Sequence, residues 1–222
     1  MDESRLQTLA AALLAAEASR KPIPPLTETD PGITVEDAYR IQLRVVEMKR
    51  SAGQAVVGKK IGLTSAAMQA MLGVGEPDYG HILNGMVVME GEKIPASDLI
   101  APRLEGEIAF ALKEDLRGPG VTLTEVIRCT EGVIPALEII DSRVRDWKIK
   151  LPDTVADNAS SARMGLLSTS RGLLLRTDLR GATVTDRNIC TNCHKSADDP
   201  ANTMARVKSH NGTKNQNVQC AD

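Results

Sequence analysis

The scarcity of aromatic residues is the feature that most constrains the core this chain can build. Only four of its 222 residues are aromatic: Tyr39, Tyr79, Phe110 and Trp147. A packed interior therefore has to be aliphatic, and hydrophobic residues, at 42% of the chain, are numerous enough for a globular protein. The same scarcity argues against a single-strand nucleic-acid binder, which stacks bases on aromatic rings. A formal charge of −2 leaves no basic excess for nucleic acid of any kind.

The apolar runs are short. The longest aliphatic run, from Leu9 to Ala16, is far below the roughly 20 apolar residues that a membrane-spanning helix needs. The chain starts with acidic residues, whereas a secretory signal starts with positive charge. Its four cysteines are too few and too clustered for a disulfide framework. We therefore expect a cytoplasmic protein with reduced thiols and no membrane contact.

Two amphipathic helices are predicted near the N-terminus. Apolar residues recur at helical spacing over residues 4–20, with Asp2 or Ser4 available as the N-terminal cap, and prolines then end the pattern. Thr34 and Asp37 have the spacing of a capping box, which begins a second helix that reaches about Arg50.

The rest of the chain favours short strands and turns, which together with the helices predicts an α+β protein. We expect a strand at 56–64, a short helix at 66–72, an irregular loop at 73–80, strands broken by turns over 86–112, a short helix at 124–131, a buried strand at 133–140 and an irregular polar segment at 141–161. By composition the chain divides into an N-terminal helical and strand portion (1–80), a β-rich portion (81–163) and an atypical tail (164–222). Residues 181–222 hold three of the four cysteines but only five large aliphatic residues, too few to bury much core.

The segment from Leu104 to Leu112 separates cleanly at period two. Its even positions are apolar or glycine and are predicted to face the core, whereas Glu105 and Glu107 share the opposite face. In a strand their α-carbons lie roughly 7 Å apart, close enough for both carboxylates to hold one cation. A solvated strand face is the alternative.

Glu138 lies inside an apolar strand, where a buried carboxylate needs a cation or a proton. Arg103 or Arg143 could pair with it. Together with Glu105 and Glu107, however, it makes a set of three carboxylates, which suits Mg²⁺ or Mn²⁺ better than zinc because no neighbouring His or Cys is evident. Spacing alone leaves both alternatives open.

Two lysines, Lys59 and Lys60, are adjacent in a predicted strand, so their side chains face opposite ways and one points inward. An inward lysine can hydrogen-bond a substrate oxygen or move a proton, although a frayed strand edge explains the pair equally well. Asp78 has the setting of a turn residue, and His81 has no evident partner.

Six segments carry a resemblance to an enzyme family. They are Val57-Gly58-Lys59-Lys60-Ile61-Gly62-Leu63-Thr64-Ser65, Glu76-Pro77-Asp78-Tyr79-Gly80, Glu105-Gly106-Glu107-Ile108-Ala109-Phe110, Pro135-Ala136-Leu137-Glu138, Asp141-Ser142-Arg143 and Asp153-Thr154-Val155-Ala156-Asp157-Asn158-Ala159-Ser160. In this order, over residues 1–163, they closely resemble the 2-hydroxypenta-2,4-dienoate hydratases of the fumarylacetoacetate hydrolase superfamily.

The resemblance implies an α+β fold with a β-rich mixed sheet and an N-terminal helical portion, in a cytoplasmic homo-oligomer. It also implies addition of water to 2-hydroxypenta-2,4-dienoate, giving 4-hydroxy-2-oxopentanoate, in the meta-cleavage degradation of aromatic compounds. Glu105, Glu107 and Glu138 match the family's ligands for a divalent metal, Mg²⁺ or Mn²⁺, which the substrate's carboxylate and 2-oxo group would chelate.

Three further site residues follow from the resemblance. Lys60 matches the family's active-site lysine and Asp78 a nearby acidic residue, and both are expected to act in proton transfer and orientation of the oxo group. Ser160 is a candidate for substrate contact.

Two alternatives remain open. The 4-oxalocrotonate decarboxylases of the same superfamily use a similar metal site, although Lys59-Lys60 and the segment 146–150 look more like the hydratases. After Ser161 the similarity fades, and the glycine-rich segment and further strands usual in the family are not evident. A truncated, non-catalytic metal-binding remnant is therefore the second alternative.

The tail contains Cys190-Thr191-Asn192-Cys193-His194, which has the form of a c-type haem attachment site. Little apolar material surrounds this motif, and no export signal accompanies it. Zinc at Cys190, Cys193, His194 and Cys220 is another interpretation, and an aberrant tail without a ligand is the one we favour.

Overall fold

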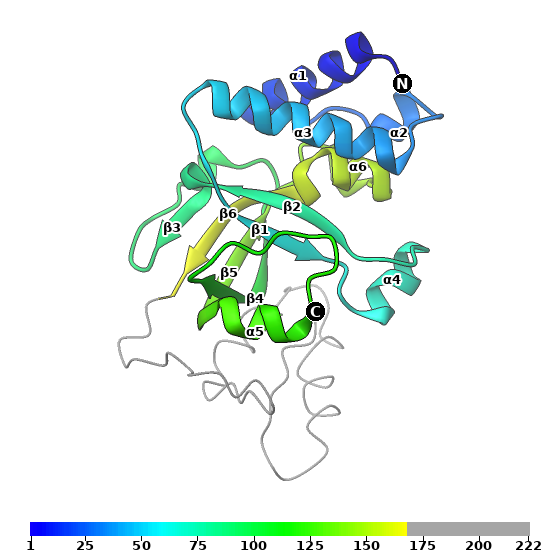
Figure 1. The fold of residues 1–222 in the computed structure, drawn as a ribbon. Coiled ribbons are helices and arrows are strands. Elements are labelled where there is room, and N and C mark those ends of the chain that lie inside the picture. The colour runs from blue at the N-terminus through cyan, green and yellow to red at the C-terminus, as the bar shows by residue number, and fades with distance from the viewer. Residues whose placement is uncertain (168–222) are drawn as a thin grey trace. The chain divides into compact units, whose positions relative to one another are not determined.

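A computed structural model describes residues 1–167 (Figure 1). The cysteine and histidine motif at 190–194 and nearly all of the predicted tail lie outside this range. The described helices are α1 (Glu3–Ser19), α2 (Leu26–Thr29), α3 (Val35–Ser51), α4 (Ala66–Leu72), α5 (Leu123–Cys129) and α6 (Leu151–Ala156). The described strands are β1 (Val56–Gly62), β2 (Asp78–Leu83), β3 (Val87–Met89), β4 (Arg103–Leu112), β5 (Thr130–Ile140) and β6 (Ser161–Leu166).

Both N-terminal helices begin where their capping residues predict. The Asp2 side chain accepts a hydrogen bond from the backbone N–H of Arg5 at the start of α1. Thr34 and Asp37 form the predicted capping box, in which Thr34 Oγ1 accepts from the Asp37 N–H at 3.1 Å. These helices are therefore confirmed to within a residue or so at each end.

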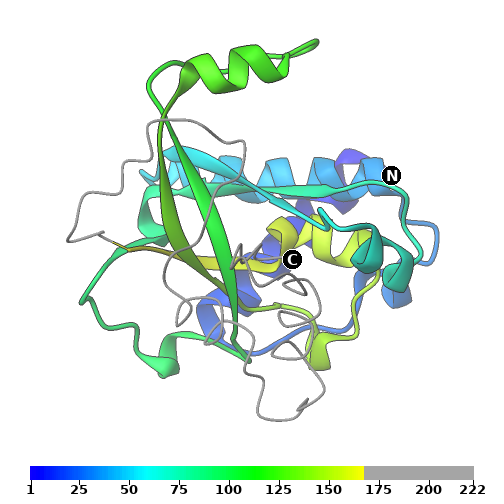
Figure 2. The same ribbon diagram turned by 90° about the horizontal axis from the view of Figure 1, so that it is seen from below.

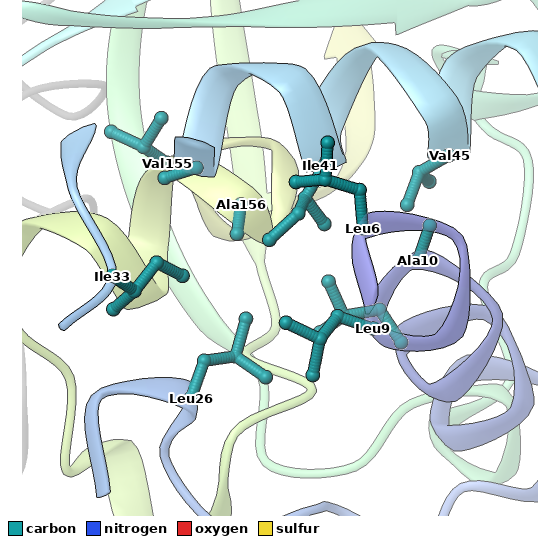
Figure 3. Packing of buried hydrophobic residues seen from close by; sticks show 11 residues of the cluster. Leu6, Leu9, Ala10, Leu26, Ile33, Ile41, Val45, Val155 and Ala156 are labelled. Atoms are coloured by element: carbon teal, nitrogen blue, oxygen red, sulfur yellow. The ribbon is translucent and has the colours of Figure 1, made fainter. Parts of the chain in front are cut away.

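The aliphatic core predicted from the scarcity of aromatics lies among α1, α3 and α6. Leu6, Ile41 and Val155 are fully buried in it. Figure 3 shows side chains of this cluster pointing toward one another from the three helices. Because the cluster joins the two ends of the described chain, α6 is packed against helices more than 100 residues earlier in the sequence.

Two segments differ from the sequence-based expectation. The segment 73–80 was expected to be an irregular loop, but its last residues, from Asp78 on, form the start of β2. The segment 141–161, expected to be irregular, contains α6 and is largely buried, because its polar side chains pair with one another and with the backbone. Polarity indicated a loop there, but satisfied hydrogen bonds allow polar groups to be buried.

The chain divides into two compact units that alternate along the sequence. Unit 1 consists of residues 1–103 and 139–164, and the described part of unit 2 consists of 104–138 and 165–167. In unit 1, β1 pairs antiparallel with β2, and β3 lies beside β6. In unit 2, β4 lies beside β5. The predicted boundary after residue 80 falls inside β2.

The even face of β4 corrects one prediction. Leu104, Ile108, Phe110 and Leu112 were expected in the core, but they are 54%, 41%, 47% and 47% exposed. In Figure 2, β4 and β5 run side by side, and α5 follows beyond one end of the pair. The period-two pattern is real, but no described residue of unit 2 forms a layer over this face.

No helix among residues 1–167 is long and apolar enough to cross a membrane.

Candidate functional site

Three glutamates from two neighbouring strands of unit 2 form the candidate metal site. Glu105 and Glu107 lie on β4 and Glu138 on β5, and one carboxylate oxygen from each lies within 4.8 Å of the others. Period two places the first two side chains on one face of β4, and strand pairing brings the third beside them. The structure thus assembles the predicted set of three.

The burial of these side chains is graded. Glu105 is exposed, Glu107 is half-buried and Glu138 is fully buried, at 0% exposure. Carboxylates this close repel one another when ionised, and burial makes the charge of Glu138 costly. A divalent cation offsets both effects, and an all-oxygen donor set suits a hard ion such as Mg²⁺. The residues present therefore fit a bound metal ion.

The arginines considered as partners of Glu138 make other contacts. Arg143 Nε donates a 2.5 Å hydrogen bond to Asp157 Oδ1, and this pair is buried. The guanidinium of Arg103 lies over the ring of Trp147, 4.2 Å from its centroid. These contacts disfavour the alternative in which an arginine neutralises Glu138.

A second cluster lies in unit 1, on the hairpin of β1 and β2. Lys60 stands opposite Gly80 and Gly62 opposite Asp78 in the strand register. Lys60 Nζ donates to the Ala159 carbonyl at 3.1 Å. A Cβ added at Gly62 would collide with Asp78 Oδ1 and would lie 3.5 Å from Lys60 Nζ. Gly62 therefore leaves the space into which the lysine and the aspartate both reach.

No family model matches the chain. It is 53% identical over 161 residues to a 2-hydroxypent-2,4-dienoate hydratase of Pseudomonas putida, a match that covers 72% of each protein. The chain belongs to the 2-hydroxypentadienoate hydratase family. The family resemblance predicted from the sequence is thereby confirmed.

Other hydratases of the family are similar over a smaller share of their length. A 2-hydroxyhexa-2,4-dienoate hydratase of Comamonas testosteroni is 48% identical over 161 residues, which are 72% of this chain and 61% of that enzyme. A 2-keto-4-pentenoate hydratase of Burkholderia vietnamiensis is 44% identical over 79% of this chain and 66% of its own length. The chain thus spans less than two thirds of these two relatives.

This chain is also similar to solved structures of a related enzyme, a decarboxylase. A 4-oxalocrotonate decarboxylase from Pseudomonas putida, complexed with magnesium and adipate, is 37% identical with a TM-score of 0.72. The match covers 75% of this chain and 63% of that one. The same decarboxylase complexed with calcium and acetate has a TM-score of 0.71.

Within the hydratase motif around Lys60, the two lysines face opposite ways as predicted. Lys60 is half-buried, whereas Lys59 is exposed, and its Nζ lies 6.0 Å from the centroid of the Tyr79 ring. Desolvation of its ammonium by the neighbouring atoms lowers the pKa of Lys59. The inward lysine is therefore Lys60.

Two motif residues are more deeply buried than their sequence setting indicated. Asp78, interpreted as a turn residue, is only 4% exposed and begins β2. Ser160 is 3% exposed, and its Oγ lies 3.3 Å from Thr154 Oγ1. Both side chains belong to the interior of unit 1.

Sequence reasoning missed the partner of His81. His81 Nδ1 lies 2.9 Å from Gln42 Oε1, while Gln42 Nε2 donates to the carbonyls of Tyr79 and Val155. Because the Gln42 amide donates to both carbonyls, its oxygen faces the ring and the proton resides on Nδ1. Desolvation, together with the charge of Lys59, lowers the pKa of His81 to about 4, so the ring is neutral at pH 7. A glutamine on the apolar face of α3 was the available signal.

Proposed function

We propose that this protein is a metal-dependent hydratase that adds water to 2-hydroxypenta-2,4-dienoate and forms 4-hydroxy-2-oxopentanoate. The observation that carries this proposal is the set of three carboxylates within 4.8 Å, in a chain 53% identical to a hydratase acting on that dienoate. The substrate is accordingly a small 2-oxo acid in its dienol form.

Glu105, Glu107 and Glu138 would hold the metal ion, which we propose is Mg²⁺ or Mn²⁺. When bound, such an ion supplies a Lewis acid for the carboxylate and 2-oxo group of the substrate. The presence of magnesium in the related decarboxylase supports the first of these ions. Glu105 is the exposed member of the three glutamates, so solvent or a ligand can reach the proposed metal site from its side.

Lys60 and Asp78 are the proposed proton-transfer pair. The ammonium of Lys60 has three N–H donors, one of which is directed at Ala159 O, and it can orient the oxo group or deliver a proton. Asp78, which reaches the same space beside Gly62, can accept a proton. Conversion of the dienol to an α,β-unsaturated ketone moves one proton from the enol oxygen to C5. Water then adds at C4, the β-carbon of that ketone. Ser160 is the proposed substrate contact.

The decarboxylase activity is the second candidate, favoured by the 37% identity to 4-oxalocrotonate decarboxylase. The hydratase remains the better proposal because identity to hydratases reaches 53%. We further propose a fold of the fumarylacetoacetate hydrolase type, which the TM-score of 0.72 supports. A homo-oligomeric assembly and a cytoplasmic location stay predictions.

Turnover by metal-stripped protein tests the proposal. Ultraviolet absorbance would follow 2-hydroxypenta-2,4-dienoate and, separately, 4-oxalocrotonate, with and without added Mg²⁺ or Mn²⁺. We expect metal-dependent loss of the dienoate, abolished in Glu107→Gln and retained in the control Glu131→Gln, which changes an exposed residue of β5.

Three results would contradict this expectation. Turnover of 4-oxalocrotonate alone would favour the decarboxylase. Metal binding by calorimetry without turnover of either compound would favour the non-catalytic remnant. Turnover unaffected by Glu107→Gln would remove the carboxylate set from the mechanism.

A further inference from the structure

Three consecutive residues after α6 adopt a left-handed backbone. Asn158, Ala159 and Ser160 have φ values of 56°, 50° and 55°. None of them is glycine, and residues with a Cβ rarely adopt this conformation even singly. A run of three such residues persists only where surrounding contacts hold it, so the contacts of this turn indicate what it is for.

The side chain of Asn158 fastens the turn to β2. Its Oδ1 accepts from the His81 N–H at 2.7 Å, and its Nδ2 donates to the His81 carbonyl at 2.9 Å. One side-chain amide thus satisfies both backbone groups of a strand residue, as a neighbouring strand would. Asn158 and His81 are 6% and 5% exposed, so water does not compete with this pair.

Gly80 allows the turn to approach this closely. A Cβ at Gly80 would lie 2.7 Å from the Asn158 carbonyl oxygen and 3.2 Å from Asn158 Oδ1. Any side chain at this position would push the turn away from β2. Gly80 stands opposite Lys60 in the strand register, so the close approach occurs beside the proposed catalytic lysine.

The turn presents a backbone acceptor to that lysine. The Ala159 carbonyl accepts from Lys60 Nζ at 3.1 Å, and the next carbonyl, of Ser160, accepts from the Asp141 N–H at 2.8 Å. Rotation of Ala159 or Ser160 to right-handed φ values would redirect these carbonyls. A lysine has a flexible four-carbon stem, so a fixed acceptor at its end narrows the positions of the ammonium.

We propose that Asn158 is a positioning residue for Lys60. Its paired hydrogen bonds with His81 hold the left-handed turn, and the turn holds the Lys60 ammonium through the Ala159 carbonyl. The catalytic consequence rests on the proposed function, in which Lys60 transfers a proton, whereas the placement of the ammonium does not.

Two substitutions disturb the turn from opposite sides. Asn158→Gly removes the amide and leaves a residue that accepts positive φ, and Gly80→Ala inserts a methyl group against the Asn158 carbonyl. We expect each to lower kcat by about 100-fold with KM changed less than about threefold, because displaced catalytic groups lose rate rather than binding. Asn158→Asp keeps the acceptor for the His81 N–H and should retain more of kcat than Asn158→Gly.

A second measurement reports on Lys60 without needing turnover. Brief acetylation with acetic anhydride, read by peptide mass spectrometry, compares labelling of Lys60 with that of the exposed Lys113 in the same sample. We expect the ratio to rise several-fold in both turn variants, because the ammonium is no longer held by a carbonyl. The control is Asn84→Gly, which removes another side-chain amide, one that accepts from the Ala55 N–H at 2.9 Å, and should change neither kcat nor the ratio.

The outcomes separate the two proposals. An inactive parent protein would overturn the proposed hydratase function, and the labelling ratio would still test the placement of Lys60. An unchanged ratio in both variants, or a lowered urea midpoint with kcat per folded molecule intact, would overturn the positioning role and leave Asn158 with a structural one.

Discussion

Unit 1 and unit 2 differ in which side chains they bury. In unit 1, aliphatic side chains fill a core among α1, α3 and α6, and the buried Arg143 and Asp157 contact each other. In unit 2, the apolar side chains of β4 are exposed, whereas the acidic residue Glu138 is fully buried at 0% exposure. The difference teaches that an apolar pattern in the sequence leads to buried side chains only where another element of the fold covers the apolar face.

The largest expected difference between the two units is the loss of free energy of unfolding when an ion pair is broken, and it concerns the buried pair of Arg143 and Asp157 in unit 1. Burial raises the pKa of Asp157 to about 6, so at pH 7 the carboxylate is charged and depends on Arg143. We expect Arg143→Met to lower the free energy of unfolding by about 3 to 5 kcal/mol, because an unpaired buried charge remains. The matched control in unit 2, Arg128→Met, breaks an exposed pair with Glu114 and should lower it by less than about 1 kcal/mol. Urea denaturation measures both, and equal losses would remove the contrast.

Aliphatic truncation tests the same contrast in apolar side chains. Leu6→Ala, at a fully buried position of α1, should lower the free energy of unfolding by about 2 to 5 kcal/mol. Ile108→Ala, at a 41% exposed position of β4, should change it by less than about 0.5 kcal/mol. A large loss from Ile108→Ala in urea denaturation would mean that the face of β4 is covered in solution.

The buried histidine of unit 1 should add a pH dependence that the described part of unit 2 does not share, because residues 104–138 and 165–167 contain no histidine. The pKa of His81 is lowered to about 4 in the folded protein, below its unfolded value near 6.5, so the unfolded state binds the proton first as pH falls. The stability that the neutral ring contributes is present above pH 6.5 and is lost as pH falls toward 4, by about 1.4 kcal/mol per pH unit.

The measurement is the free energy of unfolding from urea denaturation at several pH values. His81→Gln should remove this slope, and the difference between the two proteins isolates it from the titration of carboxylates. Parallel pH profiles for the two proteins would place the ring in a solvated environment instead.

The helix caps should show the smallest effect. Thr34→Ala removes the cap of α3 and should lower the free energy of unfolding by about 1 kcal/mol, because α3 belongs to the core. Thr122→Ala removes the corresponding capping box, formed by Thr122 and Glu125, from α5, whose seven residues include the 73% exposed Leu123, and should change only local opening. Amide hydrogen exchange distinguishes the two, and a global loss from Thr122→Ala would show that α5 is integrated into a core.

Much of the fold was predictable because the signals are local. Capping residues and helical spacing located α1 and α3, since both act within one or two turns of helix. The segment 141–161 was misinterpreted because its polar residues indicated a loop, while their partners lie elsewhere in the chain. Thr27, which donates to the buried Asp153 from its backbone N–H and its hydroxyl, is 126 residues away.

The candidate site was predictable in residue type more than in arrangement. Period two placed Glu105 and Glu107 on one face, a carboxylate inside an apolar strand indicated Glu138, and the family resemblance matched all three to metal ligands and added roles for Lys60 and Asp78. Neither source indicated that Asn158, 77 residues from His81, would bind its backbone. Contacts at such separation leave no periodic trace in the sequence.

The sequence by itself determined where the first helices begin and end, the aliphatic nature of the core and the carboxylate chemistry of β4, because steric and hydrogen-bonding preferences of neighbouring residues act within a few positions. Only the tertiary structure decided that Glu138 joins the two glutamates, that β4 leaves its apolar face exposed and that a left-handed turn reaches Lys60. The physical reason is that burial and long-range pairing depend on which distant elements meet, and chain folding, rather than local preference, decides that.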